Sequence, residues 1–192
     1  MTKKQSILWN MLVLFVILHL LLSMIYIFII HVFNALFSIV SISAILIPSL
    51  FLLLFEYIVW KQFIDSSLAE MKVHKNFKKV TIICLIPVLV CLFMLGLNEY
   101  NSNFTSSKWS EKPSKRVEII DDLLLNYDFK GMTKNEVINI LGTPSETEYF
   151  KKDNNIVYHL GYERGLISID SEWLVINFDG NEIVINYDVV TD

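Results

Sequence analysis

The chain has 192 residues, of which 54% are hydrophobic, and it carries a formal net charge of −4 at pH 7. Its charges are divided unevenly, because residues 1–97 hold 7 basic and 3 acidic side chains, whereas residues 98–192 hold 9 basic and 17 acidic ones. The acidic second half argues against nucleic-acid binding, which needs clustered Lys and Arg. The apolar excess lies in the first half, which excludes a chain that is soluble throughout.

The first half contains apolar runs long enough to span a membrane. No Asp, Glu, Lys or Arg occurs from Ile7 to Phe55, a run of 49 residues. Since about 20 apolar residues suffice to cross a bilayer, this run must fold back on itself, and polarity briefly returns at His31–Asn34. A third apolar run covers Val80–Leu97. The sequence therefore predicts a membrane region over residues 1–97, with transmembrane helices at about 7–30, 35–56 and 80–97.

The first apolar run has a competing interpretation as a cleaved signal peptide. Such a peptide has an apolar core of about 7–15 residues followed by a cleavage site of small residues, and neither feature occurs here. A lipoprotein signal is not favoured either, because no Cys directly follows this run. We therefore expect the first helix to be retained as a membrane helix.

The distribution of Lys predicts how the chain crosses the membrane, since positive charges near helix ends stay on the cytoplasmic side. Lys3 and Lys4 precede the first helix, and the loop Lys61–Lys79 contains five Lys against Asp65 and Glu70. This pattern places the N-terminus and the second loop in the cytoplasm and the C-terminal domain outside it. The expected location is the cytoplasmic (inner or plasma) membrane, with several passes.

The second half begins with a polar segment. Residues 98–107 (NEYNSNFTSS) predict a linker, so that an extracytoplasmic domain covers residues 108–192. A helix is expected from about Pro113 to Asn126, because Pro suits the first helical turn and apolar residues recur there at helical spacing. This domain contains no Cys, so its fold does not depend on disulfides.

The stretch GMTKNEVINILGTP, residues 131–144, is typical of a complete short helix. Thr133 and Glu136 have the spacing of a capping box, in which each side chain bonds the backbone N–H of the other. Gly142 can adopt the left-handed conformation that ends a helix, and Pro144 prevents its continuation. Gly131 is expected to allow a tight turn before the helix. Every residue type here has a structural explanation.

After residue 144 apolar residues alternate with period two, which is typical of strands. The turn DGN, residues 179–181, favours a hairpin between the last two of these strands. The predicted strands are Thr147–Phe150, Ile156–Leu160, Trp173–Phe178 and Glu182–Val190. The predicted fold class is thus a three-helix transmembrane region followed by a small α+β domain, with two helices packed on an antiparallel sheet of three to four strands.

The stretch GMTKNEVINILGTP resembles the SmpA/OmlA, or BamE-like, family of bacterial envelope proteins, in which a Gly-Met-Thr turn, a short helix and a Leu-Gly-x-Pro ending lead into a small antiparallel sheet. The resemblance covers roughly residues 114–192, and the later stretch GLISIDSEWLVINFDG is similar to the tails of bacterial proteins with the same helix signature. It implies a β-lactamase-inhibitor-protein-like fold and an extracytoplasmic, non-catalytic module that binds proteins or assists envelope assembly. BamE-type members are outer-membrane lipoproteins, whereas this chain has three apolar runs in place of a lipidated Cys, which favours a cytoplasmic membrane.

The C-terminal half offers few groups for chemistry. His159 is its one histidine and no Cys accompanies it, so no metal, cofactor-binding or catalytic site is predicted. Glu163 and Arg164 lie in a polar break between strands, which predicts either a binding loop or a simple turn. Trp173 and Tyr187 are expected either on the open face of the sheet, as contact residues, or in the core.

Polar side chains in the apolar first half are functional candidates, because polar groups are rare at bilayer depth. His19 lies near the middle of the first helix and Ser41 lies in the second. The structural alternative is that the His19 imidazole hydrogen-bonds a serine of the second helix.

The leading functional hypothesis is a membrane-anchored interaction protein whose partners are the lipid bilayer and another envelope protein, with a homo-oligomer as a further option. A second hypothesis is a small membrane sensor or effector whose transmembrane helices carry the activity. A third, an enzyme, would need Asp170 and Glu172 to converge; two residues apart on a strand, they share a face.

Overall fold

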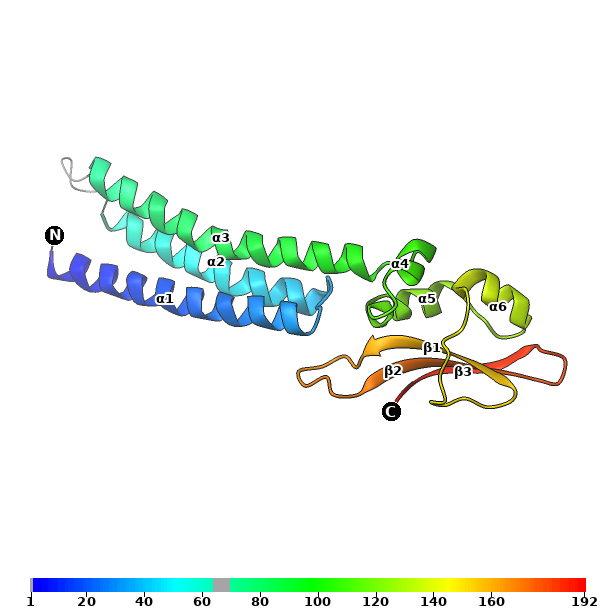
Figure 1. Cartoon of the computed structure of the whole chain (residues 1–192). Coiled ribbons are helices and arrows are strands. Elements are labelled where there is room, and N and C mark those ends of the chain that lie inside the picture. Colours follow the sequence, from blue (N-terminus) through cyan, green and yellow to red (C-terminus); the bar gives the residue numbers. More distant parts are fainter. Residues whose placement is uncertain (1, 64–69) are drawn as a thin grey trace. The chain divides into compact units, whose positions relative to one another are not determined.

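The computed structural model describes residues 2–63 and 70–192, with the side chains of residues 70–74 left out of the description. The chain divides into two compact units, Met1–Asn98 and Glu99–Asp192 (Figure 1). Asp65, one of the charges of the second loop, lies outside the described residues. The two units are described separately below.

The first unit consists of three long helices that run side by side (Figure 1). Their bounds are α1 (Lys3–Val32), α2 (Ile39–Lys61) and α3 (Glu70–Ser102). Within the described residues, Lys3–Val32, Ile39–Lys61 and Lys75–Ser102 are long and apolar enough to cross a membrane. The prediction of three apolar helices is therefore confirmed.

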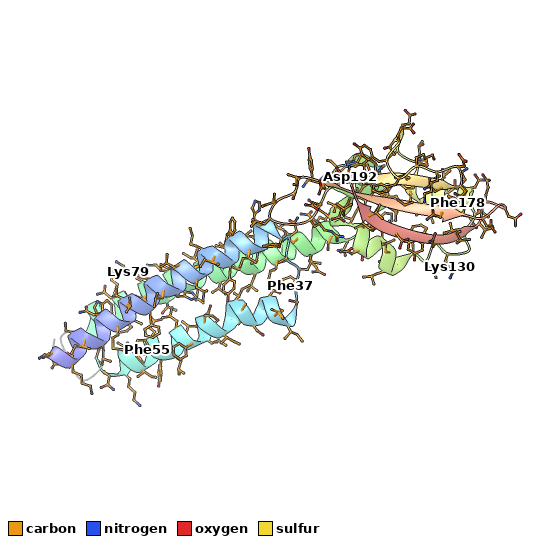
Figure 2. All side chains as sticks on the ribbon, turned by 90° about the horizontal axis from the view of Figure 1, so that it is seen from below. Phe37, Phe55, Lys79, Lys130, Phe178 and Asp192 are labelled. Atoms are coloured by element: carbon orange, nitrogen blue, oxygen red, sulfur yellow. The ribbon has the colours of Figure 1, made fainter. Side chains whose placement is uncertain are left out.

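A tight connection joins α1 to α2. Asn34 adopts a positive φ of 45°, which reverses the chain. The Asn98 side-chain amide of α3 donates to the carbonyl oxygens of Ile30 and Ala35, at 3.2 and 3.0 Å. The first bond reaches a carbonyl group in the last turn of α1, where no N–H of the helix is available, and the second reaches the connection itself. Phe37 lies in this connection (Figure 2).

The second unit places its helices on one face of a three-stranded antiparallel sheet (Figure 1). The sheet has the order β1-β2-β3, so β3 is an edge strand. Phe178 and Asp192 mark its two ends (Figure 2). The elements are α4 (Ser106–Glu111), the 3-10 helix η1 (Arg116–Glu118), α5 (Ile120–Asn126), α6 (Lys134–Leu141), β1 (Asn155–Tyr162), β2 (Ser171–Phe178) and β3 (Val184–Thr191). The α+β prediction is confirmed, with three strands.

The structure differs from the expected linker at residues 98–107, because α3 continues to Ser102 and a further short helix follows. Hydrogen bonds order this segment. The Thr105 side chain accepts from the backbone N–H of Lys108 and so caps α4. The Lys108 ammonium donates to the Tyr100 carbonyl oxygen at 2.6 Å and covers the Tyr100 ring at 4.8 Å.

The expected helix Pro113–Asn126 is broken into η1 and α5. A turn at Pro113 and Ser114 and an isolated bridge between Lys115 and Gly161 of β1 precede η1, so the helical conformation starts at Arg116 and not at Pro113. Gly161 has φ +127°, and a Cβ there would collide with the carbonyl oxygen of Ser114. A contact distant in sequence therefore overrides the local helical pattern.

The expected strand Thr147–Phe150 is absent from the structure, which has bend and turn conformations there. Phe150 has a positive φ of 56°, which is incompatible with an extended strand. Contact with β1 occurs just before this segment, where the Ser145 N–H donates to the Val157 carbonyl oxygen at 2.9 Å.

The core of the second unit lies between the helices and the sheet. Its largest fully buried side chains are Trp109, Tyr158 and Phe129. The Trp109 indole N–H donates to the Leu141 carbonyl oxygen at 2.7 Å, and the Tyr158 hydroxyl donates to that of Gly142 at 2.8 Å. At roughly 25 cal/mol per Å², a buried Trp that covers about 150–250 Å² contributes about 4–6 kcal/mol.

The Gly-Met-Thr turn, which directly precedes α6, is hydrogen-bonded to the start of β3. Gly131, at φ +86°, donates its N–H to the Val184 carbonyl oxygen at 2.9 Å, and the Val184 N–H donates to the Met132 carbonyl oxygen at 2.8 Å. Thr133 and Glu136 form a capping box at the start of α6. These bonds to the Thr133 N–H and hydroxyl hold the pKa of Glu136 below its usual range. The turn thus pairs with the outer edge of β3.

The C-terminal end of α6 is also set by residues close in sequence. Gly142, at φ +74°, terminates α6, and its N–H donates to the Ile138 carbonyl oxygen at 2.8 Å. Pro144 follows two residues later and lacks the N–H that a further helical turn would need.

Candidate functional site

Arg164 ties the loop between β1 and β2 to α5. Its guanidinium donates to both carboxylate oxygens of Glu172, at 3.1 and 2.9 Å, and to Asp121 at 2.6 Å. The Glu172 carboxylate also accepts from the Arg164 backbone N–H at 2.9 Å. Burial alone would lower the pKa of Arg164, but these hydrogen bonds outweigh it and raise that pKa. We call Arg164, Glu172 and Asp121 the arginine clamp.

The arginine clamp gives Glu172 a partner other than Asp170. Glu172 is 6% exposed and bonded to Arg164, whereas Asp170 is exposed. The Asp170 backbone carbonyl accepts from the Glu163 N–H at 2.9 Å, which closes the base of the loop. The structure therefore gives no support to a catalytic pair of Asp170 and Glu172.

The tip of the same loop is apolar and exposed. Leu166, Ile167 and Ile169 are 64%, 71% and 78% exposed, and we call these three residues the aliphatic tip. The loop extends past the ends of β1 and β2 (Figure 1). Sequence reasoning missed this feature, although the stretch GLISI contains no charged residue and is preceded by Glu163 and Arg164.

Trp173 lies on the sheet face opposite the helices. It is 8% exposed, its ring stacks on Tyr149 with centroids 5.5 Å apart, and it meets the edge of His159 at 4.7 Å. Its indole Nε1 has no hydrogen-bond partner among the described residues. We call Tyr149, His159 and Trp173 the aromatic cluster. Burial, and then the charge of Arg116, hold the pKa of His159 below its usual range.

Tyr187 lies on the other face of the sheet. It pairs with Ile176, whose side chain is in the core, and its ring meets Phe129 at 5.5 Å. Its hydroxyl bonds Asp128 at 3.4 Å, and burial followed by the Asp128 charge raises the pKa of Tyr187. The structure therefore does not bring Tyr187 and Trp173 together on one surface.

His19 is buried between the helices of the first unit. Its Nε2 lies 3.3 Å from the carbonyl oxygen of Cys84, whereas its Nδ1 has no partner among the described residues. The ring lines a cavity of about 10 Å³, room for about one water molecule. Ser23, Tyr26 and Ser49 also line this cavity, but the hydroxyl of Ser49, on the second helix, donates to the Ile45 carbonyl oxygen at 2.7 Å.

Ser41 is not part of this cavity. It occupies the third position of α2, where its hydroxyl and that of Ser38 bond each other's backbone N–H groups in a capping box. The Ser41 hydroxyl also donates to the Leu36 carbonyl oxygen at 2.9 Å. These bonds give Ser41 a role at the helix end.

Glu56 is a buried acidic residue that sequence reasoning missed. It is 5% exposed within α2, and the Thr81 hydroxyl of α3 donates to its carboxylate at 2.8 Å. The sequence feature that could have predicted its burial is its position inside the apolar stretch LLLFEYIVW. A carboxylate within a membrane helix needs a hydrogen-bonding partner. Among the residues that the structure describes, no group of three His, Cys, Asp or Glu side chains could hold a metal ion.

These observations define a class of protein in which three apolar helices precede a small α+β domain. Within that domain, residues 126–188 match the family model of the outer membrane protein assembly factor BamE domain. The matched segment includes α6, β1, β2 and most of β3. The C-terminal part of the chain is thus BamE-like, and the family resemblance seen in the sequence is confirmed. No curated protein and no solved structure matches the chain.

Proposed function

We propose that the chain is a membrane-anchored interaction protein, in which three helices in the cytoplasmic membrane hold a non-catalytic BamE-like domain outside the cytoplasm. The observation that carries this proposal is the BamE-domain match at residues 126–188 in a chain with three apolar helices. The partner is another envelope protein, and the process is envelope assembly or maintenance.

The proposed orientation rests on charge. The first 97 residues hold 7 basic and 3 acidic side chains, and the basic ones flank the cytoplasmic ends of the three helices in this orientation. The second unit is acidic and contains no Cys. Its fold therefore needs no disulfide on either side of the membrane.

The proposed partner surface is the aromatic cluster, with Glu163 nearby in sequence on the adjoining loop. Trp and Tyr are enriched among the residues that dominate binding energy in protein interfaces. The Trp173 indole N–H is buried and has no partner in residues 2–63 and 70–192, and Tyr149, which stacks on the indole, is 57% exposed. A partner that displaced the Tyr149 ring would reach both the indole face and its unpaired donor. Arg164 is omitted from this surface, since the arginine clamp already engages it.

In-cell crosslinking tests this function. A photoreactive residue would replace Tyr149 or Glu163, with Leu125 of α5, which is 85% exposed, as the control position away from the cluster. We expect adducts to one envelope protein from positions 149 and 163 and none from position 125. Adducts that are absent at all three positions, in a chain whose domain is shown to be folded and outside, would contradict the proposal.

A second candidate, a membrane effector, is favoured by the unpaired Nδ1 of His19 beside a small cavity. It predicts that His19→Ala abolishes the cellular phenotype of the chain, whereas deletion of residues 104–192 does not. The interaction function predicts the reverse pattern, so one pair of variants distinguishes the two.

A further inference from the structure

The aliphatic tip is the densest group of exposed apolar side chains in the second unit. Its three members fall within four residues, and Tyr162 at the end of β1 is also 69% exposed. Elsewhere in the unit, exposed aliphatic residues occur singly, as Leu125 on α5 and Ile185 on β3. Single exposed apolar residues are ordinary on protein surfaces, whereas a group of them indicates a contact.

The base of the loop is fixed, so the exposure of the tip is not that of an unanchored loop. The arginine clamp joins Arg164 to β2 and α5. The Glu163 N–H closes the loop on the Asp170 carbonyl oxygen at 2.9 Å. The Ser168 hydroxyl bonds the Gly165 carbonyl oxygen at 3.4 Å across the tip. The two ends of the loop are therefore held while its apolar side chains extend into solvent.

The chain keeps this domain close to a bilayer. Leu97 is the last aliphatic residue of the third apolar helix, and Phe104 already packs against the core of the second unit. A residue spans at most about 3.6 Å, so the core begins within about 25 Å of the apolar helix end. A domain of this length has a radius of gyration of about 12 Å, which brings the bilayer surface within reach of a projecting loop.

We propose that the aliphatic tip inserts into the interfacial layer of the bilayer that holds the three helices. Amphipathic elements bury their apolar faces about 5–10 Å into this layer. Residues 165–169 carry no charge, so insertion desolvates no ionised side chain. Tyr162 at the base suits the headgroup region, where amphipathic rings are common. Tethering raises the effective concentration of the membrane, so a short aliphatic tip is sufficient.

This inference rests on the membrane anchoring in the proposed function but not on the envelope partner. It also uses a different surface, because the tip shares no residue with the aromatic cluster. The purified full chain in lipid, without any other protein, is therefore the system that tests it.

The experiment places a fluorescent reporter at the tip. Ile167→Cys in the full chain would be labelled with an environment-sensitive dye and reconstituted into nanodiscs of phosphatidylcholine and phosphatidylglycerol. Ile185→Cys, at an exposed isoleucine of β3, is the matched control. The unsubstituted chain measures background labelling of Cys84 and Cys91, which are buried. Incorporation into nanodiscs is scored separately and tests the anchoring itself.

We expect a blue-shifted emission at position 167, strong quenching by nitroxide-labelled lipid and a loss of quenching by aqueous iodide, with none of these at position 185. Adding Leu166→Asn and Ile169→Asn to Ile167→Cys should abolish the lipid signal while the urea midpoint of the domain stays unchanged. Equal iodide quenching at 167 and 185 would overturn the proposal. So would protection of position 167 that develops only after envelope proteins are added, since the tip would then be a protein-docking loop.

Discussion

Arg116 in the second unit and His19 in the first are both buried, at 8% and 7% exposure, but their polar groups are satisfied to different extents. The Arg116 guanidinium donates to the carbonyl oxygens of Trp109 and His159, at 2.8 and 3.3 Å, and covers the Trp109 indole at 4.6 Å. His19 has one ring nitrogen 3.3 Å from a carbonyl oxygen, and the other has no partner within the described part of the chain.

The contrast extends to the buried carboxylates. Glu172 in the second unit accepts from both the side chain and the backbone of Arg164, whereas Glu56 in the first accepts from the neutral hydroxyl of Thr81. A fully paired buried group stabilises a fold, and its removal is costly. A partly paired group contributes less to stability, so its retention points to another role. Among these four groups, the two with several partners lie in the second unit and the two with few lie in the first, whereas Trp173, whose Nε1 has no partner among the described residues, is an exception within the second unit.

The largest effect is expected for Arg116→Met. The substitution removes the guanidinium donor from one buried and one partly buried carbonyl oxygen and removes the contact with the Trp109 ring. We expect the free energy of unfolding of the second unit to fall by about 3 kcal/mol. Urea unfolding of the full chain in detergent micelles measures it, with Lys130→Met, at an exposed position, as the control. Equal midpoints for the two variants would refute the structural role of Arg116.

A smaller loss is expected for Arg164→Met, which opens the arginine clamp. Glu172 keeps its bond to the backbone N–H of residue 164 but loses both side-chain donors, so the same unfolding measurement should show a loss of about 2 kcal/mol. Lys134→Met is the matched control, because it breaks an ion pair with Glu182 whose side chain is 64% exposed. Exposed pairs of this kind contribute about 0–1 kcal/mol. Similar losses in both variants would show that the clamp is no stronger than a surface pair.

In the first unit we expect smaller effects. Thr81→Val removes the hydroxyl that donates to Glu56, and hydrogen bonds between membrane helices contribute about 0.6 kcal/mol on average and up to about 1.7. His19→Leu should cost no more, since only one imidazole nitrogen is engaged. Unfolding of the full chain in mixed micelles with increasing dodecyl sulfate measures both. A loss for His19→Leu as large as that for Arg116→Met would remove the contrast between the units.

The smallest effect concerns pH. The pKa of His159 in the folded chain lies below its ordinary value of 6.5, because burial and then the charge of Arg116 disfavour the imidazolium. The unfolded chain therefore binds the proton more readily. The stability due to neutral His159 is fully present above about pH 6.5 and is lost as the pH falls through the lowered folded pKa. His159→Gln should flatten this part of the stability profile, and an unchanged profile in that variant would assign the dependence to another group.

Features encoded by neighbouring residues were predictable. The three apolar helices follow from the length of the apolar runs, and the capping box of Thr133 and Glu136 follows from their spacing. The strands around DGN follow from alternation and turn chemistry. In each case the determining residues lie within one element or one turn.

Features that depend on distant contacts were not predictable. The helical segment predicted from Pro113 begins only at Arg116, because the preceding backbone meets Gly161, about 45 residues later. The faces of Trp173 and Tyr187 depend on the register between β2 and β3, which contains an irregularity between Asn177 and Phe178. A shift of one residue in register exchanges the two faces of a strand. Glu56 lies at the last position of the predicted helix 35–56, but its burial depends on α3, whose Thr81 hydroxyl donates to it.

The position of Trp109 in the core limits where the second unit can be truncated or fused to another chain. The BamE-matching segment begins at residue 126, yet Trp109, Ile119 and Ile120 fill the core that its helix and sheet enclose. A fragment that starts at residue 126 would lack these side chains, which would leave a cavity in the core. It would also leave the Leu141 carbonyl oxygen without the Trp109 indole donor. The unit that folds is therefore longer than the segment that matches the family model. A fusion of this domain to another chain must include the segment from Phe104 onward.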